Sequence, residues 1–134
     1  MRYQKHAKPA AHRALQQNTR ARKKLADYLG KTVRFRAIYA CDGAMQRVYD
    51  HAGGTVLLTG LRTADGREIC SHIWVHRDAI TNPEALAVAG RGGIITFYGE
   101  AYCYIQETRR KAVTDKYSIG AITIETAEPA AAAA

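Results

Sequence analysis

The sequence lacks the long apolar segments that mark membrane and secreted proteins. It contains no apolar run near the length of about 18–20 residues that a membrane-spanning helix needs. Residues 1–30 are polar, so we also expect no secretory signal peptide. Both absences predict a single-domain cytoplasmic protein with no membrane partner.

Cysteine is scarce as well. The chain has 3 cysteines, with no C-x-x-C pair, which argues against a disulfide framework and against the usual zinc motifs. Cys41, Cys70 and Cys103 each stand in an apolar, strand-like stretch, so we expect buried free thiols. We expect no metal site from Cys41, Cys70, His72 and His76, because the spacing of residues along a strand spreads these ligands too far apart. We expect no metal and no cofactor.

Catalytic motifs are also missing. The chain contains no phosphate loop, no nucleophile elbow and no paired-carboxylate motif. The run from Gly90 to Gly93 lacks the lysine and the following helix of a phosphate loop, so it predicts a turn. Asp42, Asp50 and His51 could supply a carboxylate–histidine pair, but no matching nucleophile accompanies them. We therefore predict that the protein is not an enzyme.

Positive charge is what the chain has in excess. It carries 20 lysine and arginine residues against 12 aspartate and glutamate residues, a formal net charge of +8. Such a balance indicates a polyanionic partner. Much of the charge lies in residues 1–30, and from Pro9 to Gly30 the composition favours a helix. Leu25 and Tyr28 lie at helical spacing, so the second half of this helix can dock on an apolar surface.

The rest of the chain alternates apolar and polar residues in a way that predicts strands. Their expected bounds are 32–41, 55–62, 67–77, 93–107 and 117–125. A turn and a short helix are expected at 78–88. This order is that of the OB-fold, a five-stranded Greek-key barrel, and we place the barrel at residues 31–126. A basic arm or helix at 1–30 precedes it, and a disordered alanine-rich tail at 127–134 follows. A five-stranded SH3-like barrel and an open α+β sandwich are the alternative folds.

The strand predicted over 93–107 has two chemically different faces. The face suited to a core carries Ile95, Phe97, Gly99, Ala101, Cys103 and Ile105. The opposite face carries Tyr98, Tyr102 and Tyr104. Tyrosines on a sheet within a basic chain are typical of proteins that stack unpaired bases, although tyrosine is also simply a good strand residue. Gly60 and Gly99 are expected to supply the strong bends of a small barrel.

The predicted hairpin carries a recognisable pattern. Residues 56–62 (VLLTGLR) are followed, after a short turn, by residues 71–75 (SHIWV). Together with the basic arm and the tyrosine strand, this resembles a family of small OB-fold-like proteins of bacteria and their mobile elements, whose hairpin has a (D/S)-H-x-W signature. The resemblance covers about residues 5–125 and implies the OB-fold. It carries over His72 and Trp74 as signature positions and no catalytic residue; serine replaces the more usual acid.

The third predicted strand leaves the role of its tryptophan open. Ile69, Ile73 and Val75 form the stronger apolar pattern, which turns His72 and Trp74 to the outside or under the N-terminal helix. Trp74 either packs as a structural anchor or stacks on a base.

These observations predict a non-catalytic protein that binds single-stranded DNA or RNA. Aromatic side chains would stack on bases, and cations would contact phosphates. The candidate residues are Arg20, Lys23, Lys24, Arg34, Arg36, Arg47, Trp74, Tyr98, Tyr102, Tyr104, Arg109, Arg110 and Lys111. Those at 47 and 109–111 fall in the loops that flank the binding cleft of OB-folds.

The same sequence features are compatible with other functions. The protein could be encoded by a phage or plasmid and bind a host nucleic-acid enzyme or defence complex, modulating or inhibiting it through its basic face. It could also be a factor associated with the ribosome or another ribonucleoprotein. The N-terminal helix either contacts nucleic acid or only covers the open end of the barrel.

Overall fold

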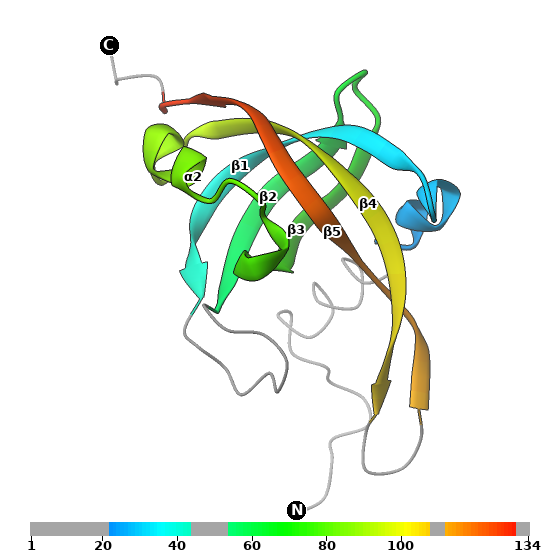
Figure 1. Cartoon of the computed structure of the whole chain (residues 1–134). Helices are drawn as coiled ribbons and strands as arrows, with labels where there is room; N and C mark the ends of the chain where they lie inside the picture. The colour runs from blue at the N-terminus through cyan, green and yellow to red at the C-terminus, as the bar shows by residue number, and fades with distance from the viewer. Residues whose placement is uncertain (1–21, 44–53, 108–111, 131–134) are drawn as a thin grey trace, which may run out of the picture.

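The computed structural model describes residues 22–43, 54–107 and 112–130 (Figure 1). Five antiparallel strands form one open sheet in the order β3-β2-β1-β4-β5. The strands are β1 (Thr32–Gly43), β2 (Thr55–Thr63), β3 (Glu68–His76), β4 (Ile94–Glu107) and β5 (Ala112–Glu128). The prediction of a mainly β protein is confirmed.

Alternation along the strands builds the core. In β1, Phe35, Ala37 and Tyr39 are buried while Arg34 and Arg36 are exposed, as the side-chain period of a strand predicts. The other strands bury Val56, Leu58, Leu61, Ile69, Ile73, Val75, Ile95, Phe97, Ala101, Ile119, Ile122 and Ile124. Burial of this apolar surface is the main force that holds the sheet in its curled form.

The sheet curls until its two edge strands approach each other (Figure 1). The Ser118 hydroxyl on β5 donates a hydrogen bond to the Trp74 carbonyl oxygen on β3 at 3.3 Å. Gly60 lies at a register shift between β1 and β2 with φ of +59°, a conformation that glycine adopts readily. A Cβ on Gly99 would lie 2.5 Å from Ile119 Cγ2, so glycine permits the close packing there. Gly60 thus meets a conformational requirement and Gly99 a packing requirement of the sheet; that they bend a closed barrel stays a prediction.

The segment that follows β3 lies along β5 and bonds its backbone. Thr81 N donates to Ile122 O at 2.7 Å. The Asn82 amide donates from Nδ2 to Ile124 O at 2.9 Å and accepts from Ile124 N at 2.8 Å. We call these two asparagine bonds the Asn82 clamp. The clamp satisfies backbone groups of a strand that would otherwise present a free edge.

The N-terminal part of the described chain packs on the sheet. The 3-10 helix η1 (Lys23–Tyr28) buries Leu25 completely. The Tyr28 ring meets the Phe35 ring edge-on, with centroids 6.4 Å apart. Docking through these two side chains was predicted and is confirmed, although as a 3-10 turn. The remainder of the helix predicted from Pro9 lies outside the described residues.

A short helical segment separates β3 from β4, as predicted. It comprises the 3-10 helix η2 (Arg77–Ala79) and the helix α2 (Glu84–Ala89). Helix α2 buries Leu86 and Ala89 and ends at Gly90, which has φ of +66°. None of the helices in the described ranges is long and apolar enough to cross a membrane.

Strands β4 and β5 extend beyond the rest of the sheet. β1 pairs with β4 as far as Glu100, whereas pairing between β4 and β5 continues to Glu107. Cys103 is therefore exposed, and the expectation that it faces the core is wrong, because β1 no longer pairs alongside β4 there. Of the other two cysteines, Cys70 is buried as expected and Cys41 is half-buried.

Strand β5 is also longer than predicted. It runs over Ala112–Glu128 rather than 117–125, because its pairing with β4 continues at both ends. Ala127 pairs with Ile95 and packs against the core, so it belongs to the strand and not to the expected tail.

Candidate nucleic-acid interface

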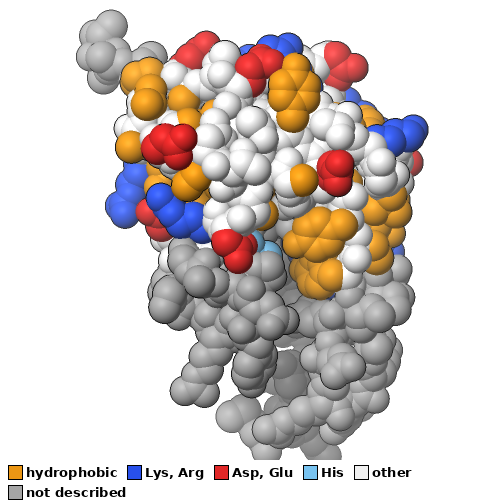
Figure 2. Space-filling model, viewed as in Figure 1, with side chains coloured by type: hydrophobic (Ala, Val, Ile, Leu, Met, Phe, Trp, Pro, Cys, Tyr) orange, Lys and Arg blue, Asp and Glu red, His pale blue; other side chains and the backbone are white. Residues whose placement is uncertain are grey.

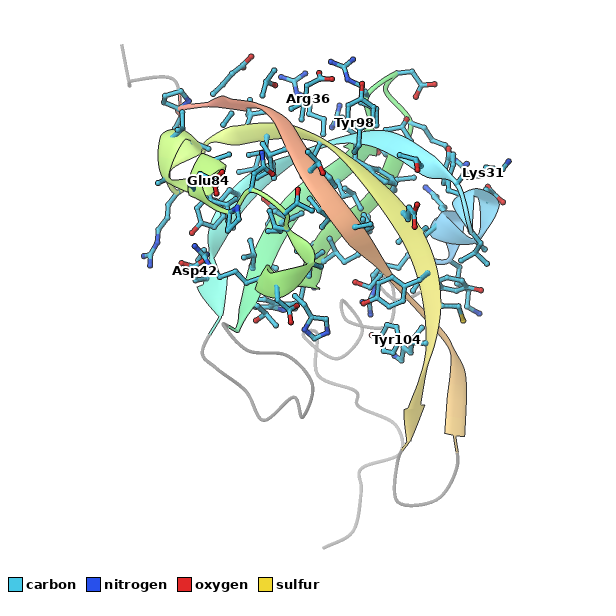
Figure 3. The ribbon with its side chains drawn as sticks, viewed as in Figure 1. Lys31, Arg36, Asp42, Glu84, Tyr98 and Tyr104 are labelled. Carbon is cyan, nitrogen blue, oxygen red and sulfur yellow. The ribbon has the colours of Figure 1, made fainter. Side chains whose placement is uncertain are left out.

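Apart from Lys23 and Lys24 on η1, the candidate residues that the structure describes lie on the outer surface of the sheet, and we divide them and their neighbours into two sets. The arginine–tyrosine group comprises Arg34, Arg36, Arg62, Tyr98 and Glu125. The aromatic band comprises Trp74, Tyr102 and Tyr104. Figure 3 shows Tyr98 near Arg36 at one end of the molecule and Tyr104 at the other. Five predicted site residues lie outside the described residues: Arg20, Arg47, Arg109, Arg110 and Lys111.

Strand register assembles the arginine–tyrosine group. Pairing of β1 with β4 sets Arg34 opposite Tyr98. Pairing of β1 with β2 sets Arg36 opposite Arg62. All four residues are exposed, so this part of the outer face presents three guanidinium groups beside one tyrosine ring. Of these, Arg62 was not predicted.

Glu125 neutralises one of these arginines. Arg34 Nε donates to Glu125 Oε1 at 3.1 Å, and its Nη2 forms an ion pair with the same oxygen. The bonds from Arg34 and from the Tyr98 hydroxyl hold the pKa of the Glu125 carboxyl below its usual value. The same hydrogen bond to Glu125 raises the pKa of Tyr98. The carboxylate thus occupies donors that could otherwise meet a phosphate.

The other two arginines are poorly compensated. Arg36 has no acidic partner among the described residues. Arg62 Nη2 lies 3.9 Å from Glu68 Oε1, on a glutamate side chain that is 81% exposed. A pair so exposed to water contributes little. The predicted Lys24 lies close by, since its Nζ donates to the Glu68 carbonyl oxygen at 3.3 Å, and Lys23 is exposed on the same short helix.

Trp74 lies on the outside of β3. Its side chain is 45% exposed, while Ile69, Ile73 and Val75 point into the core as predicted. The indole rests across β2 on the end of β1, because a Cβ on Gly43 would lie 2.8 Å from Trp74 Cζ3. The ring is therefore packed along one side and open to solvent elsewhere.

The two tyrosines of the aromatic band lie together on β4. The Tyr102 and Tyr104 rings have centroids 6.0 Å apart and are half-buried. The Tyr102 ring covers Gly120 and bonds to the Ser118 hydroxyl, and burial is the main cause that raises its pKa. Ser118 also donates to the backbone carbonyl of Trp74, so this serine links Tyr102 on β4 to the backbone of β3. The sequence does not predict a role for Ser118. Its one signal in the sequence is a polar residue within a strand that is largely apolar.

The three tyrosines predicted to share one face of β4 do not form one continuous surface. At a rise of about 3.3 Å per residue, β4 covers about 20 Å between Tyr98 and Tyr104. Tyr98 instead belongs with Arg34 and Glu125. Figure 2 shows hydrophobic side chains gathered at the lower edge of the described surface, and basic side chains around its margins. The pair of Tyr102 and Tyr104 and the exposed arginines are thus separated on the surface (Figure 3).

Two searches, one for metal sites among the described residues and one for similar proteins, find nothing. Within the ranges that the structure describes, no group of three His, Cys, Asp or Glu side chains could hold a metal ion. Comparison of the chain with models of protein families, with curated proteins and with solved structures finds no match.

Proposed function

We propose that the protein is a non-catalytic binder of single-stranded DNA or RNA built on an OB-fold-like barrel. The strand order supports the fold: β1 lies between β2 and β4, and β5 approaches β3. A helix between β3 and β4 agrees with the same arrangement.

The aromatic band is the observation that carries the functional proposal. Trp74 is exposed, and Tyr102 and Tyr104 stand side by side, on the outer surface of a chain with net charge +8. Strands β1 and β4, which precede the β1–β2 and β4–β5 connections, both end in the lower part of the view in Figure 1. In OB-folds these two connections flank the nucleic-acid surface.

The chemistry of the band suits unpaired bases of any sequence. Each base that stacks on an aromatic ring contributes about 1–3 kcal/mol, and every base has a face that can stack. The Tyr102 hydroxyl is engaged by Ser118. Its ring is therefore held in place and offers an oriented surface, at little entropic cost on binding.

Tryptophan fluorescence tests the proposal directly, because the chain has only 1 tryptophan. We expect a single-stranded oligonucleotide of about 10 nucleotides to quench Trp74 emission. Tyr104→Ala should weaken binding by about 1–3 kcal/mol, or roughly 5- to 150-fold. Val88→Ala is the control, because Val88 is 62% exposed on α2, outside the band. Unquenched emission, together with full affinity of a folded Tyr104→Ala variant, would refute stacking.

A second measurement separates specific from generic binding. Anisotropy of labelled single-stranded DNA, single-stranded RNA and duplex of equal length would be recorded over a salt series. Preference for a single strand near physiological salt supports the proposal. Equal weak binding to all three that disappears with salt would indicate charge alone.

The alternative is a protein that binds and modulates a host nucleic-acid enzyme or defence complex. The exposed Trp74 and Arg36 favour it, because tryptophan and arginine are enriched at the energetic centres of protein interfaces. A stable protein complex that survives nuclease treatment, with no quenching of Trp74 by oligonucleotides, would identify this function.

A further inference from the structure

We propose that Arg36 and Arg62 form a second phosphate-binding surface, separate from the aromatic band, which holds the backbone of the same bound single strand. This inference rests on the proposed function. It adds that the bound nucleic acid contacts two separate surfaces: its bases stack on the aromatic band, and its phosphates bind Arg36 and Arg62.

The geometry of the pair favours a phosphate. Arg36 and Arg62 are register partners on neighbouring strands, so their side chains leave the same face of the sheet side by side. Each guanidinium presents N–H donors in a planar fork that matches phosphate oxygens. On the other side of Arg36, its β4 partner is Thr96, whose hydroxyl is a further possible donor.

The pairing is unfavourable without an anion. Like charges directly opposite each other on a sheet are destabilising. Among the described residues, only Glu68 offsets the repulsion, with its Oε1 3.9 Å from Arg62 Nη2. No described carboxylate pairs with Arg36. A phosphate bound between the two guanidinium groups would relieve it.

Arg34 differs from its neighbours because Glu125 already holds it. The Arg34 guanidinium and the Tyr98 hydroxyl both bond to this carboxylate, which therefore occupies an anion position. A phosphate must displace Glu125 before it can reach Arg34. Glu125 thus acts as a built-in competitor that limits how strongly this face binds polyanions.

Distance makes the two surfaces separable by experiment. Thr96, the β4 partner of Arg36, lies about 26 Å along the strand from Tyr104 at a rise of about 3.3 Å per residue. An oligonucleotide of about 4 nucleotides, the smallest site of an OB-fold, can cover the band alone. One of about 30 nucleotides is long enough to reach both surfaces.

The test compares both lengths on a double variant, Arg36→Gln with Arg62→Gln. For single strands each neutralised phosphate contributes about 0.7 to the salt slope. Loss of the one phosphate held between the two guanidinium groups should therefore lower the slope for the long oligonucleotide by about 0.7 and weaken its binding about 5-fold near 0.1 M salt. Quenching of Trp74 by the short one should not change. The control is Lys31→Gln with Arg91→Gln, which removes the same charge from exposed positions outside the strands.

The outcomes distinguish the two proposals. If the double variant keeps the slope and affinity for the long oligonucleotide while Trp74 is still quenched, the second surface is wrong and the proposed function stands. If the control weakens binding equally, the effect is generic charge and the second surface is again wrong. If neither oligonucleotide quenches wild-type Trp74, yet the double variant alone loses binding, the stacking function fails and the arginine surface stands.

Glu125→Gln tests the competitor role. It should release Arg34, raise the salt slope for the long oligonucleotide by about 0.7 and strengthen binding about 5-fold near 0.1 M salt. Unchanged slope and affinity would refute the competition.

Discussion

Replacing Asn82 with alanine removes both bonds of the Asn82 clamp. The wild-type amide joins Ile124 O at 2.9 Å and Ile124 N at 2.8 Å. Ile124 is only 6% exposed, so water cannot easily replace the lost side chain. The substitution therefore leaves a donor and an acceptor of a buried strand unsatisfied.

We expect the free energy of unfolding to fall by about 2–4 kcal/mol. A typical hydrogen bond contributes about 1 kcal/mol, and a buried polar group left unpaired adds about 1–3 kcal/mol. Thr81→Ala is the matched control on the neighbouring residue. It loses only an exposed contact to the Thr123 hydroxyl and keeps its backbone bond to Ile122, so it should cost at most about 1 kcal/mol.

Equilibrium urea unfolding, followed by circular dichroism, measures both variants. The slope of the unfolding free energy with urea should stay constant, so that the midpoint reports stability alone. An Asn82→Ala protein within about 0.5 kcal/mol of wild type would show that the clamp does not hold β5, and would refute the reasoning.

Three further predictions concern single side chains. Burial raises the pKa of the Cys70 thiol from its ordinary 9.0 to about 11, so the folded state keeps a proton that the unfolded chain loses. Stability should therefore fall by about 2–3 kcal/mol as the pH rises from about 9 to about 11, and urea titrations of Cys70→Ala should lack this fall. Gly43→Ala should displace the indole whose Cζ3 would lie 2.8 Å from the new Cβ, and a tryptophan emission spectrum identical to wild type would contradict the packing. Tyr102→Phe removes the hydroxyl bonded to Ser118 and should lower the unfolding free energy by about 1 kcal/mol, unless Ser118 is already alanine.

Local alternation was enough to predict much of the core. Phe35 and Ala37 point inward and Arg34 and Arg36 outward because the period of a strand fixes its faces. Alternation does not predict where a strand extends beyond the last residue of the neighbouring strand that pairs with it. Cys103 continues the apolar face of β4, yet it is exposed because the pairing with β1 has already ended.

The site depends on contacts between distant segments. Glu125 meets Arg34 across β4 because β5 contains an extra residue where the register shifts between Thr96 and Phe97. Neither the bulge nor the pairing of Arg36 with Arg62 follows from the pattern of one strand. The basic and aromatic residue types were predictable, but their division into two surfaces required the register.

The bonds that follow β3 also affect how copies of the chain can associate. A strand at the edge of a sheet is a template on which another chain can add a strand. On β5 the backbone at Ile122 and Ile124 is already bonded by Thr81 and Asn82. A second copy cannot extend the sheet at these positions. Self-association at this part of β5 would have to use side-chain contacts instead of backbone pairing.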